Sequence, residues 1–542
     1  MRLTTDIAHT NDDIDRACLR VLRCPDPFAV KNRLQEKDKL LYESIGWILR
    51  DPQYVSWRNG NNVNLLWIKG GAGKGKTMMS IGLVEQLSGA QDEITVVTYF
   101  FCQNADLELN TIEAIIKGLI FRLISQQKDL KECLRRRWDT VNERFNEDIK
   151  AWRTLWGIFL EMLDHCKSQR IYVIVDALDE CQDKGMAELL RLIVRTGLSH
   201  RSKIKWLLTS RPLDSAEQEL LTGSDQERVS LELNSNHVAE AVRTYAASRA
   251  DELERRQRYG PVLRRKVEAA LVEKAEETFL WVSLVCKRLE SVPRDNVLAT
   301  IQELPPGLHS FYGRILYQLG QGDSANAEGC LRLLKVMLFA YRPLKLEEVA
   351  AVTGLPENQI GAFVDRCASF IKKRETDVDF VHQSARDYLG GKDGRPILDS
   401  RGPYEHGEIA LSCLFYLFDQ LKVNLMDLPR PDSTRESMKA LNDERRNAKL
   451  ASMDYAATFW VQHLNDAKYT TLIQNILAEQ GKVNMFLRKK LLEWLECLSL
   501  LDKLPRAIEA FKVLRDIAEV SIRLLTSMII VSLKLHRDDH SY

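Results

Sequence analysis

The chain has 542 residues, of which 45% are hydrophobic and 28% charged, a composition typical of globular protein with room for about three to four domains. Its 77 basic and 76 acidic residues leave a net charge of +1, which argues against nucleic acid and membrane surfaces as partners. The 11 cysteines include no C-x-x-C pair, which favours reduced thiols in a cytoplasmic protein over a disulfide framework or a zinc site.

No segment of the sequence has the length and apolarity of a membrane span. The N-terminus lacks the apolar core of a signal peptide. The longest late apolar stretch, residues 524–533, is about half as long as a span requires. We interpret that stretch as a core helix.

Residues 1–60 are predicted to form an N-terminal helical segment. A helix face within it breaks at Asp51-Pro52 and consists of Leu40, Leu41, Ile45, Trp47, Ile48 and Leu49. From residue 61 to 233 apolar strands alternate with helices, the pattern of an α/β domain with a parallel sheet. Asn110 and Glu113 stand at capping-box spacing before the first helix of its central section. The predicted strands are 63–69, 94–101, 171–175, 204–209 and 228–233.

Predicted strands become rare after residue 233. Residues 234–310 read as helices up to the breaker at 305–307, Pro-Pro-Gly. Residues 311–400 combine three helices with two short apolar runs, 369–372 and 378–381, a pattern that predicts a winged helix. The remaining residues, 401–542, read as helices only, and no repeat of roughly 20–50 residues is visible.

The first chemical motif is a phosphate loop between a predicted strand and a predicted helix. It reads Gly-Gly-Ala-Gly-Lys-Gly-Lys-Thr and is a complete G-x-x-x-x-G-K-T sequence. Glycines let backbone N–H groups approach phosphate, and a helix N-terminus favours an anion. Lys76 is expected to contact the β- and γ-phosphates of a nucleotide, and Thr77 to bind Mg²⁺. The whole loop is therefore assigned to nucleotide binding: Gly70, Gly71, Ala72, Gly73, Lys74, Gly75, Lys76 and Thr77.

A second motif starts with Ile-Tyr-Val-Ile-Val-Asp at 171–176. Its apolar residues predict a buried strand with Asp176 at the carboxyl end, where ligands bind in open α/β sheets. A carboxylate there can hold Mg²⁺ directly or through water. Asp179 and Glu180 follow in the turn. Each is a candidate to orient an attacking water, and the sequence does not choose between them; acids that merely cap a helix are the alternative for all three.

A third motif, Thr-Ser-Arg-Pro at 209–212, ends another predicted strand. A hydroxyl and a guanidinium at a strand tip suit recognition of a γ-phosphate. Thr209 is therefore assigned to nucleotide binding and Arg211 to catalysis. The proline restricts Arg211 to an extended backbone, and a surface arginine in a turn is the alternative.

Together, residues 70–77, 176–181 (Asp-Ala-Leu-Asp-Glu-Cys) and 209–212 resemble the NACHT group of STAND signalling ATPases. The chain resembles in particular the fungal NACHT proteins that include heterokaryon-incompatibility NTPases, whose P-loop domain is of the nephrocystin-like N-terminal type. The resemblance implies an α/β P-loop NTPase with a parallel sheet, of AAA+/STAND type. The expected domains are an N-terminal helical segment (1–60), the NACHT core (61–233), a helical lid (234–310), a winged helix (311–400) and a C-terminal helical region (401–542).

Later segments also resemble this family. Residues 274–281 resemble its lid motif, usually K-A-x-G-x-F-L-W, with Glu277 in place of the glycine. This replacement argues against a close backbone approach at that point. Residues 342–348 and 381–389 resemble the winged-helix segments of the family, and residues 455–463 resemble its helical continuation.

The resemblance also implies a role for His382, at a predicted strand-to-helix junction. In relatives of the STAND class, a winged-helix histidine contacts the β-phosphate of bound ADP and locks an off state. By position, His382 is the candidate. A lone histidine at such a junction can instead be a helix cap or a satisfied core residue.

The function that the resemblance implies is a nucleotide-dependent signalling switch of a fungal NLR-like pathway, in heterokaryon incompatibility or innate immunity. Such a protein holds ADP when closed, exchanges it for ATP with Mg²⁺, hydrolyses ATP slowly and forms a homo-oligomer when activated. The trigger, the effector and the choice of adenine or guanine are not readable, and the chain is expected to be truncated or reduced. The alternatives are a pseudo-ATPase scaffold that binds nucleotide without turnover, an AAA+-like ATPase acting on nucleic acid, and a metabolic P-loop kinase.

Overall fold

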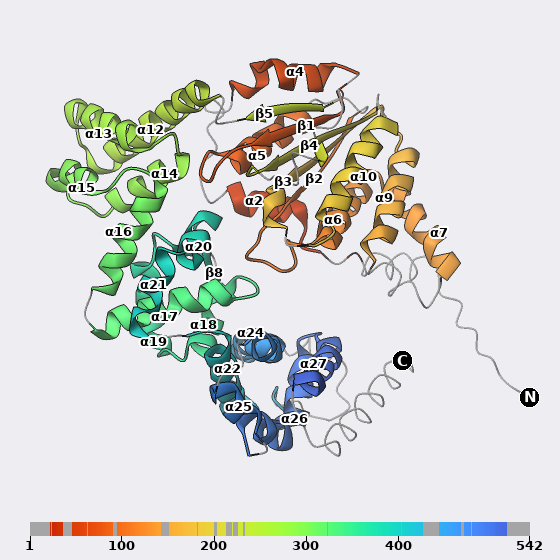
Figure 1. The fold of residues 1–542 in the computed structure, drawn as a ribbon, viewed down its shortest axis with the longest axis vertical. Coiled ribbons are helices and arrows are strands. Elements are labelled where there is room, and N and C mark those ends of the chain that lie inside the picture. The colour runs from red at the N-terminus through yellow and green to blue at the C-terminus, as the bar shows by residue number, and fades with distance from the viewer. Residues whose placement is uncertain are drawn as a thin grey trace, which may run out of the picture. The chain divides into compact units, whose positions relative to one another are not determined.

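The structure is a computed structural model of the chain. The chain divides into two compact units, Met1–Phe311 and Tyr312–Tyr542, and each is described by itself (Figure 1). The finer division into five domains stays a prediction. The structure describes residues 22, 24–35, 46–61, 63–89, 95–141, 151–181, 183–199, 203–212, 219–220, 226–230, 234–321, 324–374, 376–402, 404–426, 444–467, 471–478 and 480–517.

Two predictions of the sequence concern segments outside these residues: the helix face around residues 40–45 and the apolar stretch 524–533. None of the described helices combines the length and the apolarity that crossing a bilayer requires. The described cysteines are all free thiols, which agrees with the sequence.

The first unit is built on a five-stranded sheet in the order β2-β3-β4-β1-β5, and all its neighbours are parallel. Four of its strands lie within two residues of the predicted bounds. The fifth starts two residues earlier than predicted, and its predicted end at 231–233 lies outside the described residues. Because β1, β3 and β4 are almost wholly buried, they read as continuous apolar runs. The strands are β1 (Leu65–Lys69), β2 (Thr95–Phe101), β3 (Arg170–Asp176), β4 (Ile204–Ser210) and β5 (Gln226–Ser230).

Helices cover the sheet and extend beyond it. The helix α4 lies beside β1 and β5 (Figure 1), and Trp206 of β4 packs against Trp156 and Phe159 of α9, with ring centroids 6.0 and 6.1 Å away. The helices of the sheet region are α2 (Pro27–Gln35), α4 (Pro52–Asn59), α5 (Lys76–Ser88), α6 (Ile112–Gln126), α7 (Lys131–Val141), α9 (Trp152–His165) and α10 (Met186–Ser199). The lid region contains α12 (Ser235–Gln257), α13 (Pro261–Lys274), α14 (Phe279–Leu289) and α15 (Val297–Glu303), and α16 (Leu308–Gly320) follows.

The cap of α6 differs from the prediction. Thr111, not Asn110, is its N-cap, and the Thr111 hydroxyl accepts a hydrogen bond from Ala114 N at 3.1 Å. Asn110 donates its side-chain amide to Asn104 O at 3.2 Å instead. The predicted Asn110–Glu113 capping box is therefore wrong, because the N-cap lies one residue later and the Asn110 side chain hydrogen-bonds the loop after β2.

The second unit combines helices with a three-stranded antiparallel sheet in the order β6-β8-β7. Its three expected helices and its hairpin are present, whereas the two-residue strand β6 was not predicted because it is too short to show alternation. The winged-helix interpretation itself stays a prediction. The elements are α17 (Ser324–Phe339), β6 (Leu344–Lys345), α18 (Leu346–Thr353), α19 (Glu357–Arg366), β7 (Ile371–Arg374), β8 (Asp377–Phe380), α20 (Gln383–Gly390), α21 (Gly394–Leu398), α22 (His406–Gln420), α24 (Glu444–Asp466), α25 (Thr471–Leu477), α26 (Lys482–Leu500) and α27 (Leu504–Ile517).

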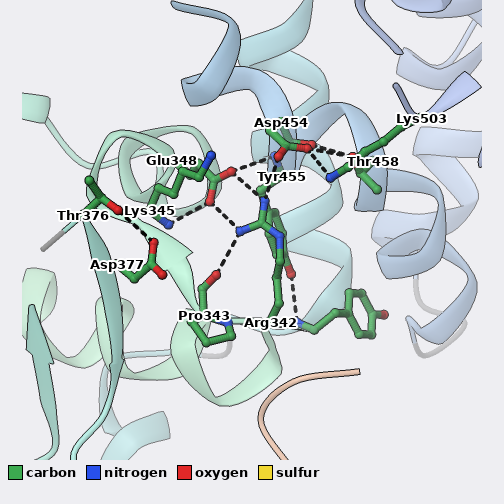
Figure 2. Close-up of polar contacts among 11 residues, drawn as sticks. Arg342, Pro343, Lys345, Glu348, Thr376, Asp377, Asp454, Tyr455, Thr458 and Lys503 are labelled. Carbon is green, nitrogen blue, oxygen red and sulfur yellow. Dashed lines mark hydrogen bonds and ion pairs between the residues drawn. The ribbon is translucent and has the colours of Figure 1, made fainter. Parts of the chain in front are cut away.

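A buried carboxylate joins α18 to α24 in this unit (Figure 2). Glu348 is fully buried and accepts two hydrogen bonds from the guanidinium of Arg342, at 2.6 and 2.8 Å. It also accepts from the backbone N–H groups of Lys345 and Tyr455, at 2.8 and 3.1 Å. The segments 342–348 and 455–463, which resemble the family separately, thus contact each other through Glu348.

A second acid completes this network (Figure 2). Asp454 lies 3.5 Å from Arg342 and 2.5 Å from the ammonium of Lys503 on α27. Burial alone would raise the pKa of Asp454, but the charges of Lys503 and Arg342 hold this pKa below its usual value. Through Asp454, the network therefore links Arg342, just before β6, to Lys503, just before the last described helix, α27.

We expect Arg342→Met to lower the free energy of unfolding of the second unit by about 3–5 kcal/mol, because it leaves the Glu348 carboxylate buried without a cation. The double variant Arg342→Met/Glu348→Gln should lose clearly less, since it leaves no buried charge, although its single amide oxygen accepts from only one of the N–H groups of Lys345 and Tyr455. Urea denaturation followed by circular dichroism measures both. Equal losses in the two variants would show that the charge pair is not what stabilises this joint.

A pair of histidines lies beside this network. His463 is fully buried, and its Nδ1 lies 2.7 Å from Nδ1 of His406 and its Nε2 lies 2.8 Å from the Tyr455 hydroxyl. Burial, together with the neighbouring His406, holds the pKa of His463 well below its usual value, and burial also lowers the pKa of His406. The Tyr341 hydroxyl lies 3.5 Å from Nδ1 of His406 and donates to the Asp466 carboxylate at 2.6 Å.

The lowered pKa of His463 predicts acid sensitivity. Below a pH of about 6.5 the unfolded chain binds a proton that the folded chain excludes, so the free energy of unfolding should fall as the pH drops from about 6.5 toward 5. His463→Gln should make this fall shallower. Thermal unfolding measured across this pH range tests the prediction, and an identical slope in both proteins would contradict it.

Candidate functional site

The phosphate loop connects β1 to α5 at the carboxyl end of the sheet. Gly73 and Gly75 have φ values of +74° and +86°, in the left-handed region that residues with a Cβ rarely adopt. Gly75 is the N-cap of α5, so the loop turns directly into the helix. Gly70 N donates to Ser210 O at 3.1 Å, which fixes the start of the loop to the end of β4.

Lys76 is folded back over its own loop. Its ammonium donates to Gly70 O at 2.5 Å and to Gly71 O at 2.8 Å. These contacts place a positive charge within the curve of the loop, beside the N-terminus of α5. Both features favour an anion at this position.

Asp176 ends β3, two strands away from β1. It is 1% exposed, and its Oδ1 accepts from the hydroxyls of Ser80 and Thr209, each at 2.6 Å. Burial raises the pKa of Asp176, while hydrogen bonds from Ser80, Thr209 and Thr77 and the charge of Lys76 oppose that rise. The structure thus brings together the predicted magnesium ligands, Thr77 and Asp176, and the charge of Lys76 acts on Asp176.

Thr209 lies near the carboxyl end of β4, the strand between β1 and β3. Besides donating to Asp176, its hydroxyl accepts from Ala177 N at 2.9 Å. Ala177 has a φ of +56°, an uncommon conformation for a residue with a Cβ, and turns the chain away from β3. The predicted role of Thr209 in nucleotide binding stays a prediction; what the structure gives it is the orientation of Asp176.

Asp179 and Arg211 face each other across this edge. Arg211 Nε lies 3.1 Å from Asp179 Oδ2, and Arg211 N donates to Asp179 Oδ1 at 3.0 Å. Glu180 accepts from Asn104 N at 3.0 Å, which ties it to the loop after β2. The two candidates for orienting water therefore have different surroundings, but their roles stay predictions.

The lid segment 274–281 contacts the phosphate loop through the backbone of Phe279 and the side chain of Glu277. Phe279 N donates to Gly73 O at 3.0 Å, and a Cβ at Gly75 would lie 3.1 Å from the Phe279 ring. Glu277 itself adopts the left-handed conformation, with φ of +57°. The expected lack of a close backbone approach at Glu277 itself stays a prediction, because the backbone contact with the loop is made by Phe279.

His382 belongs to the second unit, so its distance from the loop is not described. It is the N-cap of α20, and its Nδ1 accepts from Ser384 N at 3.0 Å. This is the capping role that the sequence left open as an alternative. Contact with a phosphate stays a prediction.

Two groups at the site were missed in the sequence. Ser80 hydrogen-bonds Asp176, and its position one helical turn after Lys76 is a signal that could have identified it. The contacts of Thr278, Phe279 and Leu280 with the loop glycines carry no local signal, because they join segments about 200 residues apart in the sequence.

A separate group of possible metal ligands lies between α7 and α9: Cys133, Glu161 and His165. Arg136 Nη2 lies 2.9 Å from Glu161 Oε1, 3.3 Å from His165 Nε2 and 3.5 Å from Cys133 Sγ. The guanidinium thus supplies the positive charge that these three groups attract, and we assign no metal to them.

Comparisons with known proteins agree with the resemblance read from the sequence. Residues 43–211 match the family model described as Nephrocystin 3, N-terminal. Over 533 residues the chain is 34% identical to vegetative incompatibility protein HET-E-1 of Podospora anserina, a match that covers 94% of this chain and 39% of that protein. The chain thus spans about two-fifths of the length of this curated relative. The predicted similarity to fungal incompatibility NTPases with a nephrocystin-like P-loop domain is confirmed.

Two solved structures match the chain at low sequence identity. A Walker-type ATPase of Pyrococcus abyssi is 15% identical, with a TM-score of 0.31, and the match covers 65% of this chain and 97% of that chain. A STAND protein of Pyrococcus horikoshii with a tetratricopeptide repeat sensor is 13% identical, with a TM-score of 0.34. This match covers 84% of this chain and 62% of that chain.

We expect Asp176→Asn to remove the effect of Mg²⁺ on nucleotide binding while leaving the fold intact. The amide oxygen can still accept from Ser80 and Thr209, but it lacks the charge that Mg²⁺ requires. Thermal unfolding with ATP, with and without Mg²⁺, measures this effect. The control is Asp129→Asn, because the Asp129 side chain is 79% exposed. An Mg²⁺-dependent stabilisation that survives in Asp176→Asn would contradict the assignment.

Proposed function

We propose that this chain, whose P-loop region is of the nephrocystin 3 N-terminal type, binds ATP and ADP with Mg²⁺ and works as a nucleotide-dependent signalling switch. The setting that its similarity to HET-E-1 suggests is a fungal NLR-like pathway of incompatibility or innate immunity, in the cytoplasm. The observation that carries the proposal is the convergence of Lys76, Thr77 and Asp176 at the carboxyl edge of the sheet.

Each of these residues has a distinct part in the proposed site. The loop amides and Lys76 bind the β- and γ-phosphates, and Lys76 offsets their charge. The hydroxyl of Thr77 and the carboxylate of Asp176 are hard oxygen donors, the kind that Mg²⁺ prefers, and would hold the ion. When bound, Mg²⁺ neutralises charge that develops on the phosphates during transfer.

Hydrolysis, which we propose to be slow, needs a group that orients water. Asp179 and Glu180 are the candidates, and Arg211 is placed to stabilise charge on the γ-phosphate. In the structure Arg211 is paired with Asp179. We propose that this pair has to rearrange before Asp179 orients water, which would keep turnover low.

The same ion pair supports a second candidate function. If Asp179 and Arg211 keep each other engaged, the chain is a scaffold that binds nucleotide without turnover. Phosphate release from ATP, measured beside binding, separates the two functions. Binding without any release above that of Lys76→Ala would favour the scaffold.

The switch is proposed to couple the nucleotide to assembly. The lid segment lies on the phosphate loop through Phe279 and Glu277, so a change in the loop reaches the lid directly. We propose that ADP holds the closed form and that ATP favours a homo-oligomer. His382 is proposed to contact the β-phosphate of ADP, as its position in the family pattern suggests.

Lys76→Ala should abolish nucleotide retention, because an ammonium about 4 Å from a phosphate contributes roughly 4 kcal/mol at an effective dielectric near 20. Mass spectrometry of the purified variant identifies any retained nucleotide, and light scattering with ADP or a non-hydrolysable ATP analogue gives oligomer size. Lys117→Ala is the control, since Lys117 pairs with Glu113 on α6. Full retention of nucleotide by Lys76→Ala would refute the proposed binding site. The same oligomer size with ADP and with the ATP analogue would refute the proposed coupling to assembly.

A further inference from the structure

The lid places an acid on the phosphate loop. Lys74 lies between the two loop glycines that contact the lid, and its ammonium is 2.9 Å from Glu277 Oε2. Its side chain is 15% exposed and that of Glu277 37%. A partly sheltered pair of this kind is screened less by salt than one in open solution.

The carboxylate of Glu277 is directed at Lys74 by a strained turn. Glu276 and Glu277 both have positive φ values, 46° and 57°. Residues with a Cβ persist in this region only where their surroundings fix them, and such outliers cluster at functional positions.

The surroundings of the turn do fix it. On its N-terminal side, the ammonium of Lys274 donates to the carbonyls that end α15, those of Ile301, Gln302 and Leu304, at 3.0, 2.7 and 2.6 Å. On its C-terminal side, Phe279 N is bound to Gly73 O. The backbone of Glu277 is therefore held near the loop from both ends, which keeps its carboxylate within reach of Lys74.

An anion in the loop must contend with both members of this pair. The positive charge of Lys74 is already balanced by Glu277, so it attracts phosphate less than a free lysine would. The carboxylate of Glu277 also repels each negative charge that enters the loop. Because a triphosphate carries more negative charge than a diphosphate, the unfavourable effect is larger for the triphosphate.

We propose that Glu277 is a specificity-determining residue of the nucleotide site, which weakens the binding of nucleoside triphosphates relative to diphosphates through its pairing with Lys74. This inference rests on the proposed function, in which the loop binds nucleotide. It makes the lid a source of preference for the diphosphate, in addition to a cover on the loop.

The test is Glu277→Gln, which removes the charge and keeps the shape and the backbone conformation. Calorimetric titration with Mg²⁺ and either ADP or a non-hydrolysable ATP analogue gives both affinities. We expect the analogue to bind about tenfold more tightly than to the original protein and ADP to gain about threefold or less. The difference should shrink at about 0.5 M salt, where charges are more strongly screened.

Glu276→Gln is the matched control. It removes the same charge from the neighbouring left-handed residue, whose carboxylate lies over Gly307 and not on Lys74. We expect its ratio of analogue to ADP affinity to stay that of the original protein. Glu277→Gly, which removes the charge and also relieves the strained φ, should shift the ratio in the same direction as Glu277→Gln.

The outcomes separate this inference from the proposed function. If the original protein binds neither nucleotide, the proposed function is wrong. If it binds both, but Glu277→Gln and Glu277→Gly leave the ratio unchanged, or Glu276→Gln shifts it equally, Glu277 does not determine specificity.

Discussion

The carboxyl edge of the sheet depends on one buried carboxylate, that of Asp176. Its Oδ1 accepts from a hydroxyl on α5 and from one on β4, so it joins the helix that follows the phosphate loop to the strand beside it. A buried carboxylate is unfavourable unless hydrogen bonds and nearby positive charge compensate it. Ser80, Thr209 and Lys76 provide that compensation, and together they fix where the loop and β3 meet.

The phosphate loop is shaped from two sides. The carboxyl ends of the neighbouring strands, with Asp176, lie on one side of the loop. The lid residues from Thr278 to Leu280 lie on the other side. Gly73 and Gly75 are consequently favoured for two reasons: their φ values are positive, and a Cβ at either position would lie close to lid side chains. A change in the loop would act directly on the lid through these contacts, and the proposed coupling of nucleotide to conformation rests on them.

Much of this arrangement could be predicted from the sequence. Strands β1, β3 and β4 are continuous apolar runs because they are buried, and the loop, Asp176 and Thr209 lie at or directly after the carboxyl ends of these strands. The ligands of the site were therefore readable from local order. The contact of Glu277 with the loop was not: the sequence argued only against a close backbone approach at this residue, and the structure shows its positive φ and its pairing with Lys74. The joint of Arg342, Glu348 and Tyr455 was hidden for a different reason, since Tyr455 lies 107 residues away from Glu348 in the sequence.

The most direct test of the account is calorimetric titration of the purified chain with ADP and with a non-hydrolysable ATP analogue, each in the presence and absence of Mg²⁺. The account predicts one nucleotide bound per chain and weaker binding of the analogue once Mg²⁺ is removed. A well-folded protein that releases no heat with any purine di- or triphosphate would contradict it.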